Sequence, residues 1–245
     1  MDAFLVNPNL PDGKVTLAAA GDYPEIISAL QGLGIKTLSF ENKLLPVEIR
    51  RHSDMLICHT GGSSLFCDPS QDTDMLEKTG FITEVSDPLG GAYPEDVRLN
   101  VAVGRNFFVY NPKTADIMLS GELIIRGKLP VAVLQGYSKC SLCLVTDDAV
   151  ITEDEGIGTA LRAVGKDVLM ISKGDVYLSE NHYGFFGGSS GKTDKHTLAV
   201  TGQLKYHTDG EKIKEFCKKH GVKILELTKG RITDIGGILP LKQIT

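Results

Sequence analysis

Short apolar runs alternate with amphipathic stretches along the chain, and this alternation repeats. In the clearest repeat, the apolar run 141–145 predicts a strand, and residues 149–152 predict a second strand after a turn. Residues 153–164 have the spacing and the acidic first turn of a helix, which Gly165 ends. A buried strand is expected over 168–171. The repeating unit is therefore strand, strand, helix, strand.

The same order can be traced through the rest of the chain. In the last unit, a strand over 197–200 is expected to pair with 203–206, before a helix over 210–220 and a closing strand over 222–227. A final strand over 232–239 is expected to complete the sheet of the N-terminal unit. The expected units are residues 1–60, 61–104, 105–139, 140–194 and 195–245.

These units favour an α/β fold in one domain over 1–245, a five-bladed α/β-propeller. We expect a pseudo-fivefold ring of β-β-α-β units that the two termini close. The alternative is an ordinary doubly wound sheet, which also alternates strands and helices. The short helices and the hairpin in each unit favour the ring, because an all-parallel sheet needs no hairpins.

Composition narrows the possible partners and compartment. The 245 residues are 42% hydrophobic and 23% charged, which is typical of a soluble globular protein. The net charge of -5, without a basic block, argues against a nucleic-acid partner, and no apolar run is long enough to span a membrane. The first residues lack the pattern of a secretion signal, and the five cysteines suggest reduced thiols, so a cytoplasmic protein is expected.

The five-unit pattern, with the stretches 135–141 and 183–188, resembles the pentein fold, an α/β-propeller, in a bacterial branch that lacks the catalytic cysteine. That superfamily contains guanidino-group-modifying enzymes: arginine and agmatine deiminases, dimethylarginine hydrolases and amidinotransferases. It is also similar to the non-catalytic ribosome anti-association factor. The resemblance covers nearly the whole chain at the level of the repeat. A fold alone does not determine function.

The family's catalytic groups can be compared with this sequence one by one. Its nucleophile is a cysteine just after a C-terminal Gly-Gly turn; here Gly236 and Gly237 keep the turn, but no cysteine follows. Its general base lies in a Gly-His-x-Asp stretch. The matching stretch 191–194 keeps Asp194, but Lys192 stands where the histidine belongs. Covalent amidine chemistry needs a thiolate and a base, so we expect no standard deiminase activity.

The Gly/Ser-rich stretch 187–193 nearly matches a phosphate-binding P-loop. Phe186 stands where that motif needs glycine, and a strand is expected after the stretch where a P-loop has a helix. A flexible loop is the better interpretation. Its backbone amides can still bind an anion as a nest.

Cys140 is the thiol candidate for chemistry. Cys140 and Cys143 are three apart in an expected strand and face opposite sides, which argues against a redox pair or half a zinc site. Lys139 is expected to lower the pKa of the neighbouring Cys140 thiol. Neither a metal nor a cofactor is expected.

Turns between units are expected to crowd around the axis of the ring and to form a pocket. Lys192 and Arg105 would make this pocket locally positive, and such a field attracts anions. The candidate ligand-binding residues are His59, Arg105, Asn106, Ser189, Ser190, Lys192 and Asp194.

Three functions remain open. The first is binding of a small polar or anionic ligand in the axial pocket, without standard guanidino hydrolysis. The second is an enzyme of the amidine hydrolase or transferase class with remodelled catalytic residues, drawn from Lys192, Asp194 and Cys140. The third is a macromolecule-binding factor like the ribosome factor. Convergence of Lys192, Asp194 and His59 in one concave pocket would favour the first two.

Overall fold

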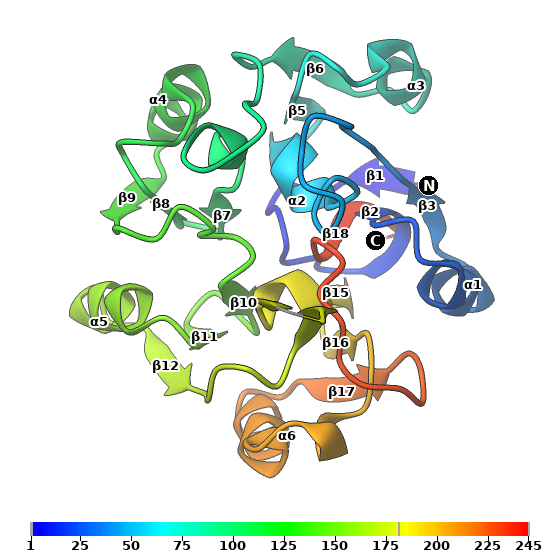
Figure 1. The fold of residues 1–245 in the computed structure, drawn as a ribbon, viewed down its shortest axis with the longest axis vertical. Coiled ribbons are helices and arrows are strands. Elements are labelled where there is room, and N and C mark those ends of the chain that lie inside the picture. Colours follow the sequence, from blue (N-terminus) through cyan, green and yellow to red (C-terminus); the bar gives the residue numbers. More distant parts are fainter. Residues whose placement is uncertain (1, 181, 245) are drawn as a thin grey trace.

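The computed structural model describes residues 2–180 and 182–244. Small sheets lie inside, and helices lie around the outside (Figure 1). Within the described residues there are five separate sheets of three or four strands and one two-stranded hairpin. The architecture is α/β propeller-like.

One sheet shows how the sequence builds the repeated unit. Strands β10 (Leu142–Leu144) and β11 (Ala149–Thr152) pair antiparallel, as expected for a hairpin. Helix α5 (Glu155–Ala163) then crosses back, and β12 (Asp167–Met170) pairs parallel to β11. The helix begins at Asp154, whose side chain accepts the Ile157 N–H (2.8 Å). The predicted order of strand, strand, helix, strand is correct here.

Three further sheets follow the same order. Their elements are β4 (Ile57–Gly61), β5 (Ser64–Cys67), α3 (Thr73–Lys78) and β6 (Ile82–Val85); β7 (Ala102–Val103), β8 (Phe107–Tyr110), α4 (Ile117–Ile125) and β9 (Leu129–Ala132); and β15 (Ser190–Asp194), β16 (Thr197–Val200), α6 (Gly210–Lys219) and β17 (Lys223–Glu226). Between sheets lie α2 (Ser53–Leu56), the hairpin β13 (Tyr177–Ser179) and β14 (His182–Tyr183), and the 3-10 turns η1 (Glu95–Val97), η2 (Gly187–Ser189) and η3 (Leu204–Tyr206). The expected unit boundaries near 61, 105 and 195 fall at turns inside these sheets.

The two ends of the chain meet in the remaining sheet (Figure 1). Strand β18 (Ile238–Ile244) lies between β1 (Asp2–Phe4) and β2 (Lys14–Ala20) and pairs antiparallel with both. Helix α1 (Pro24–Gly32) leads to β3 (Lys36–Leu38), which pairs parallel to β2. The terminal strand therefore begins at 238, later than expected, because Gly236 and Gly237 form a turn at positive φ before it.

The expected strand over 203–206 is wrong. Residues Leu204–Tyr206 form η3, and the partner of β16 is β15, which precedes it in the chain. The sequence of β15 is rich in glycine and serine, which have a low strand propensity. The close approach of β15 to β18 nevertheless requires a residue without a side chain. A Cβ on Gly191 would lie 1.9 Å from the Ile238 carbonyl oxygen, so only glycine lets β15 pass this close to β18.

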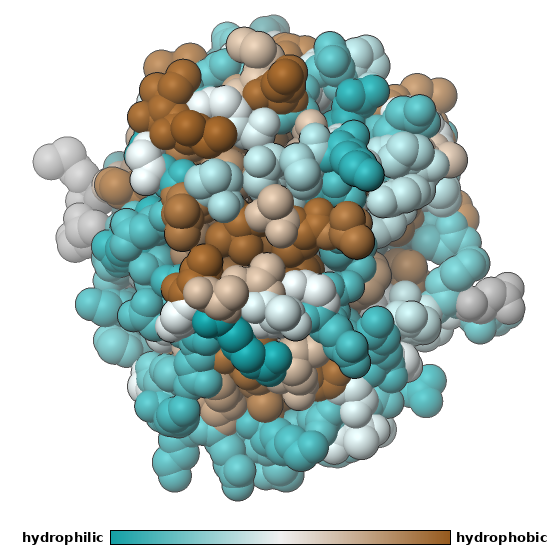
Figure 2. Space-filling model, turned by 90° about the vertical axis from the view of Figure 1, so that its left-hand side faces the viewer, coloured by the Kyte–Doolittle hydropathy of each residue, from teal (hydrophilic) through white to brown (hydrophobic). Residues whose placement is uncertain are grey.

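Apolar side chains gather on the surface of the side that carries α4 and β9 (Figure 2). The exposed large side chains of this region are Ile117, Met118, Ile124, Ile125, Leu129 and Leu134. In the part of the chain that the structure describes, every helix is too short or too polar to cross a bilayer.

Candidate functional site

Hydrogen bonds join, in a cycle, the five segments that lead into β4, β7, β10, β15 and β18. Asn100 Nδ2 donates to the Asp54 carbonyl (3.1 Å), and the Cys140 N–H donates to Asn100 Oδ1 (3.2 Å). The Gly188 N–H donates to the Cys140 carbonyl (2.8 Å). The glycine pair 236–237 donates to the Gly188 carbonyl (2.7 Å) and accepts the Asp54 N–H (3.2 Å). The starts of strands far apart in sequence therefore meet at one place.

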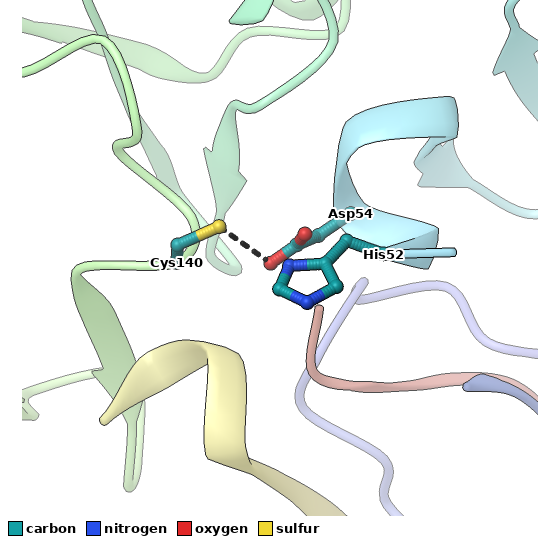
Figure 3. Close-up of side chains that lie close together, drawn as sticks. All are labelled: His52, Asp54 and Cys140. Atoms are coloured by element: carbon teal, nitrogen blue, oxygen red, sulfur yellow. Dashed lines mark hydrogen bonds between the residues drawn. The ribbon is translucent and has the colours of Figure 1, made fainter. Parts of the chain in front are cut away.

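Three reactive side chains point toward one another at this place (Figure 3). Cys140 Sγ donates to Asp54 Oδ2 (3.1 Å) and accepts from Asn100 Nδ2 (3.1 Å). One ligand atom from each of His52, Asp54 and Cys140 lies within 4.8 Å of the others. We call these three residues the His–Asp–Cys cluster. None of them is more than 2% exposed, so the cluster is shielded from bulk water.

Burial dominates the electrostatics of the cluster. It raises the pKa of Asp54, against the lowering effect of the charges on Lys139 and His52. It also raises the pKa of Cys140 well above its usual value, and the Asp54 carboxylate adds to this effect. The expected lowering of the Cys140 pKa by Lys139 is therefore wrong, because the thiol lies in a dry site beside a carboxylate.

Two acceptor or donor atoms of the cluster have no partner among the described residues. These are Asp54 Oδ1 and His52 Nε2, both of which are buried. The other His52 nitrogen, Nδ1, lies 3.6 Å from Asp234 Oδ1. Asp234 is itself fixed by the N–H groups of Phe185 (2.8 Å) and Gly236 (3.0 Å). Backbone N–H groups thus hold Asp234 beside His52, while two polar atoms of the cluster have no hydrogen-bond partner among the described residues.

Little free space adjoins the cluster. The cavity beside Asp54 and Lys139 has a volume of about 20 Å³, which holds about one water molecule. Its walls include His59 and the side chains of Leu239 and Pro240. These last two follow the Gly-Gly turn after which the resembling family has its catalytic cysteine. An organic ligand reaches the cluster only if this wall moves.

A larger cavity lies at the opposite end of β10. Cys140 of the cluster lies just before Leu142, the first residue of β10. The second cavity is lined by residues 145–147, which follow Leu144, the last residue of β10. Its volume is about 170 Å³. We call it the turn-end cavity; it is lined by Leu10, Pro11, Asp12, Arg105, Val145, Thr146, Asp147, Lys192, Lys195, His196 and His220.

Two of the predicted ligand-binding residues come together in the turn-end cavity. Arg105 lies in the turn between β7 and β8, and its guanidinium pairs with Asp12 (3.1 Å). Lys192 lies on β15, only 2% exposed, and its ammonium donates to the carbonyls of Val145 (3.2 Å) and Lys195 (2.8 Å). Burial lowers the pKa of Lys192 to about 8. Lys192 thus lines the turn-end cavity, and its two hydrogen bonds also link the turn at Val145 to the turn at Lys195.

The expected convergence of Lys192, Asp194 and His59 in one pocket is wrong: Lys192 lines the turn-end cavity, His59 lines the small cavity beside Asp54, and Asp194 lines neither of them. Asn106 reaches Asp147 of the turn-end cavity (3.3 Å), and Asp194 accepts the His196 N–H (2.7 Å). His59 lines the small cavity near the cluster; its Nε2 lies 2.8 Å from the Gly62 carbonyl, and burial lowers its pKa to about 4.

Ser189 and Ser190 are buried, and both hydroxyls donate to the Phe186 carbonyl (2.9 and 2.8 Å). A 3-10 turn and then strand β15 follow Phe186, so the stretch lacks the helix of a P-loop.

Sequence reasoning missed His52, Asp54, Asn100 and Asp234. One signal was present, since His52 and Asp54 form a His-x-Asp pair at the start of α2, the helix before β4. The resembling family has its His-x-Asp pair at a different unit, so the resemblance did not indicate this position. Asn100 and Asp234 carry no local motif; only the fold brings them to the cluster.

Comparisons with solved structures give the same fold. The inosamine-phosphate amidinotransferase of Streptomyces griseus has a TM-score of 0.58 at 11% identity, over 99% of this chain and 98% of that one. An agmatine deiminase of C. jejuni has a TM-score of 0.55 at 11% identity, over 90% of each chain. A dimethylarginine dimethylaminohydrolase has a TM-score of 0.52 at 11% identity, over 86% of this chain and 92% of that one. No curated protein sequence matches.

The resemblance to the guanidino-group-modifying enzymes is thus confirmed at the level of the fold. At 11% identity this similarity says nothing about substrate. A protein-family model matches residues 19–239. The chain therefore belongs to DUF6873, a family of unknown function.

Proposed function

We propose that this chain is a closed, five-bladed propeller protein that binds a small anionic ligand in the turn-end cavity, without standard guanidino hydrolysis. The observation that supports it most is that Arg105 and Lys192, from different sheets, line the same cavity of about 170 Å³. Pairing of β1 with β18 supports the closed ring.

The charges around the cavity favour an anion. Three cationic residues, Arg105, Lys192 and Lys195, face two carboxylates, Asp12 and Asp147. One positive charge remains in excess, although the whole chain carries -5. A positive cleft concentrates anions, and an arginine fork suits a carboxylate or phosphate. The volume is below the roughly 300–1,000 Å³ of pockets for drug-sized ligands, so the ligand has few carbon atoms.

Calorimetric titration with inorganic phosphate, pyrophosphate and succinate tests this function. Arg105→Gln should weaken binding of the best anion by roughly 10–100-fold, the equivalent of one charge-assisted hydrogen bond. Arg50→Gln is the matched control, because Arg50 also pairs with an acid at the surface (Glu41, 3.0 Å) but lies outside the cavity. Equal affinities of the wild type and Arg105→Gln would contradict the proposal.

An enzyme of the amidine hydrolase or transferase class is the second candidate. It is favoured by the thiol, carboxylate and imidazole of the His–Asp–Cys cluster, in which Cys140 would be the nucleophile. The small cavity and the raised pKa of Cys140 disfavour it. A haloacetamidine, which alkylates a thiol that binds an amidine, separates the two: an adduct on Cys140 supports the enzyme, and an unmodified Cys140 supports the binding protein.

A further inference from the structure

We propose that the His–Asp–Cys cluster binds a single transition-metal ion, and that Zn²⁺ is the ion its donors suit best. This site goes beyond the anion-binding function, because it uses other residues at the opposite ends of the strands.

The donor set is the first argument. A thiolate, an imidazole nitrogen and a carboxylate oxygen are the ligands that zinc takes in proteins. The three ligand atoms lie within 4.8 Å of one another. Zinc bonds of about 2.0–2.3 Å in a tetrahedron place ligand atoms about 3.5 Å apart. Cys140 Sγ and Asp54 Oδ2 are already 3.1 Å apart, and a pair at the upper bound of 4.8 Å would need a contraction of about an ångström, which side-chain torsions can supply. The three ligands leave one coordination position open.

The unsatisfied atoms are the second argument, and they are independent of the donor types. Asp54 Oδ1 and His52 Nε2 are buried without a hydrogen-bond partner among the described residues. Buried polar atoms without partners are rare, and each costs roughly 1–3 kcal/mol. A cation bound at these atoms would give them the partner that the described residues do not supply. Asp234 Oδ1 lies 3.6 Å from His52 Nδ1, so a small shift would form the carboxylate–histidine hydrogen bond that commonly orients a metal-bound histidine.

The balance of charge is the third argument. Two carboxylates, Asp54 and Asp234, are buried near the cluster together with one lysine, Lys139, so acidic groups outnumber basic ones there. A divalent cation would offset this excess of acidic groups. The Asn100 amide already donates to Cys140 Sγ (3.1 Å) and would stabilise the thiolate.

The space on the Asp54 side of the cluster suits an ion better than an organic cation. The cavity there measures about 20 Å³ and is lined by Asp54 but by neither His52 nor Cys140. A space of this size admits an ion the size of a water molecule but not a guanidinium group. The closed wall that disfavours an organic substrate is therefore compatible with a metal.

Titration of the chelator-treated, full-length protein with Zn²⁺ and Co²⁺ tests the site. Zinc binding is measured by competition with a chromophoric chelator, and cobalt binding by the sulfur-to-cobalt charge-transfer absorption in the near ultraviolet. We expect one ion per folded chain and a thiolate band in the cobalt form. Cys140→Ser should remove the band and weaken Zn²⁺ binding by at least about 100-fold, beyond the 10–100-fold typical for residues that only orient a ligand.

Cys143→Ser is the matched control, because Cys143 is also buried, in strand β10 just after Cys140, but lies outside the cluster. This variant should keep both the band and the affinity. Asp54→Asn, which preserves the shape of the side chain, provides a second variant in case Cys140→Ser unfolds, and it should weaken binding while keeping the band. A folded wild type that takes up no ion, or a band that Cys140→Ser retains, would overturn the proposal.

Discussion

The Cys140 thiol donates a hydrogen bond to the Asp54 carboxylate across 3.1 Å, although the two residues are 86 apart in the sequence. This contact joins the segments that lead into β4 and β10. Both groups are buried, and burial raises the pKa of each. Without a metal ion the Cys140 thiol therefore keeps its proton near neutral pH and donates it to the Asp54 carboxylate in the hydrogen bond. A protonated thiol is a poor nucleophile.

The first prediction concerns thiol reactivity. All five cysteines are free and buried, and burial raises the pKa of Cys58 to about 12 and of Cys143 to about 11. A disulfide reagent should therefore label the native, metal-free protein only slowly, and it should label all five thiols after unfolding in guanidinium chloride. Mass spectrometry of the digested protein locates the label. Rapid labelling of native Cys140 would show that the cluster is open to solvent.

The second prediction concerns Lys192 and pH. Burial lowers its pKa from the usual 10.5 to about 8, so between these values the unfolded chain binds more protons than the folded chain. The contribution of Lys192 to stability should therefore rise as the pH rises from about 8 to about 10.5. Urea unfolding of the wild type and Lys192→Met at both ends of this range measures it. The wild type should gain stability relative to the variant; a constant difference would contradict the buried position.

Lys192 also has a structural role. Lys192→Met leaves the carbonyls of Val145 and Lys195 without their donor. We expect a loss of stability of about 1–3 kcal/mol near pH 7, the cost of a buried polar group left unpaired. For this reason Arg105, and not Lys192, is the better position for testing ligand binding.

The third prediction concerns Glu153, whose Oε1 accepts the Phe186 N–H (3.0 Å) while Oε2 is buried without a partner. Burial raises its pKa from 4.5 to about 8, so between these values the folded state binds more protons than the unfolded state, and stability falls as the pH rises. Glu153→Gln should remove this part of the pH dependence and gain stability over the wild type toward pH 8. Glu155→Gln, at an exposed neighbouring position, is the control for the loss of one carboxylate.

The fourth prediction concerns the closest approach of two strands. Gly191→Ala places a methyl group against the Ile238 carbonyl, so β15 and β18 must separate. We expect a loss of at least about 1–3 kcal/mol in chemical unfolding. Gly121→Ala is the control, because nothing lies within 4 Å of a Cβ there and the residue is inside α4. This control should be neutral or stabilising by up to about 1 kcal/mol. A Gly191→Ala protein as stable as this control would contradict the close packing of β15 on β18.

The repeated unit was predictable because its signals are local. Apolar runs mark the strands, aspartates such as Asp154 begin helices, and glycines at positive φ such as Gly165 follow their ends. The pairing of β15 was not predictable, because its Gly/Ser sequence is typical of a loop and only the approach of Ile238 explains Gly191. Tertiary contacts outweigh propensity at such positions.

The candidate sites were predictable only in part. Arg105 and Lys192 could be placed near one another because both lie near turns of the repeated unit. The His–Asp–Cys cluster could not, because the His-x-Asp pair at the start of α2 and Cys140 before β10 are far apart in the sequence, and only the fold brings them together. The pKa of Cys140 was predicted in the wrong direction because sequence shows the neighbouring Lys139 but not the burial or Asp54.

Mapping the anion-binding residues by nuclear magnetic resonance tests the central claim most directly. The backbone amide spectrum of the full chain is recorded during titration with the anion that binds best. We predict that the largest shift changes occur at the lining turns 104–106, 145–147 and 194–196, and that Arg105→Gln reduces them. Saturable changes confined to the segments around Asp54, Cys140 and Gly236, with these turns unaffected, would contradict the claim.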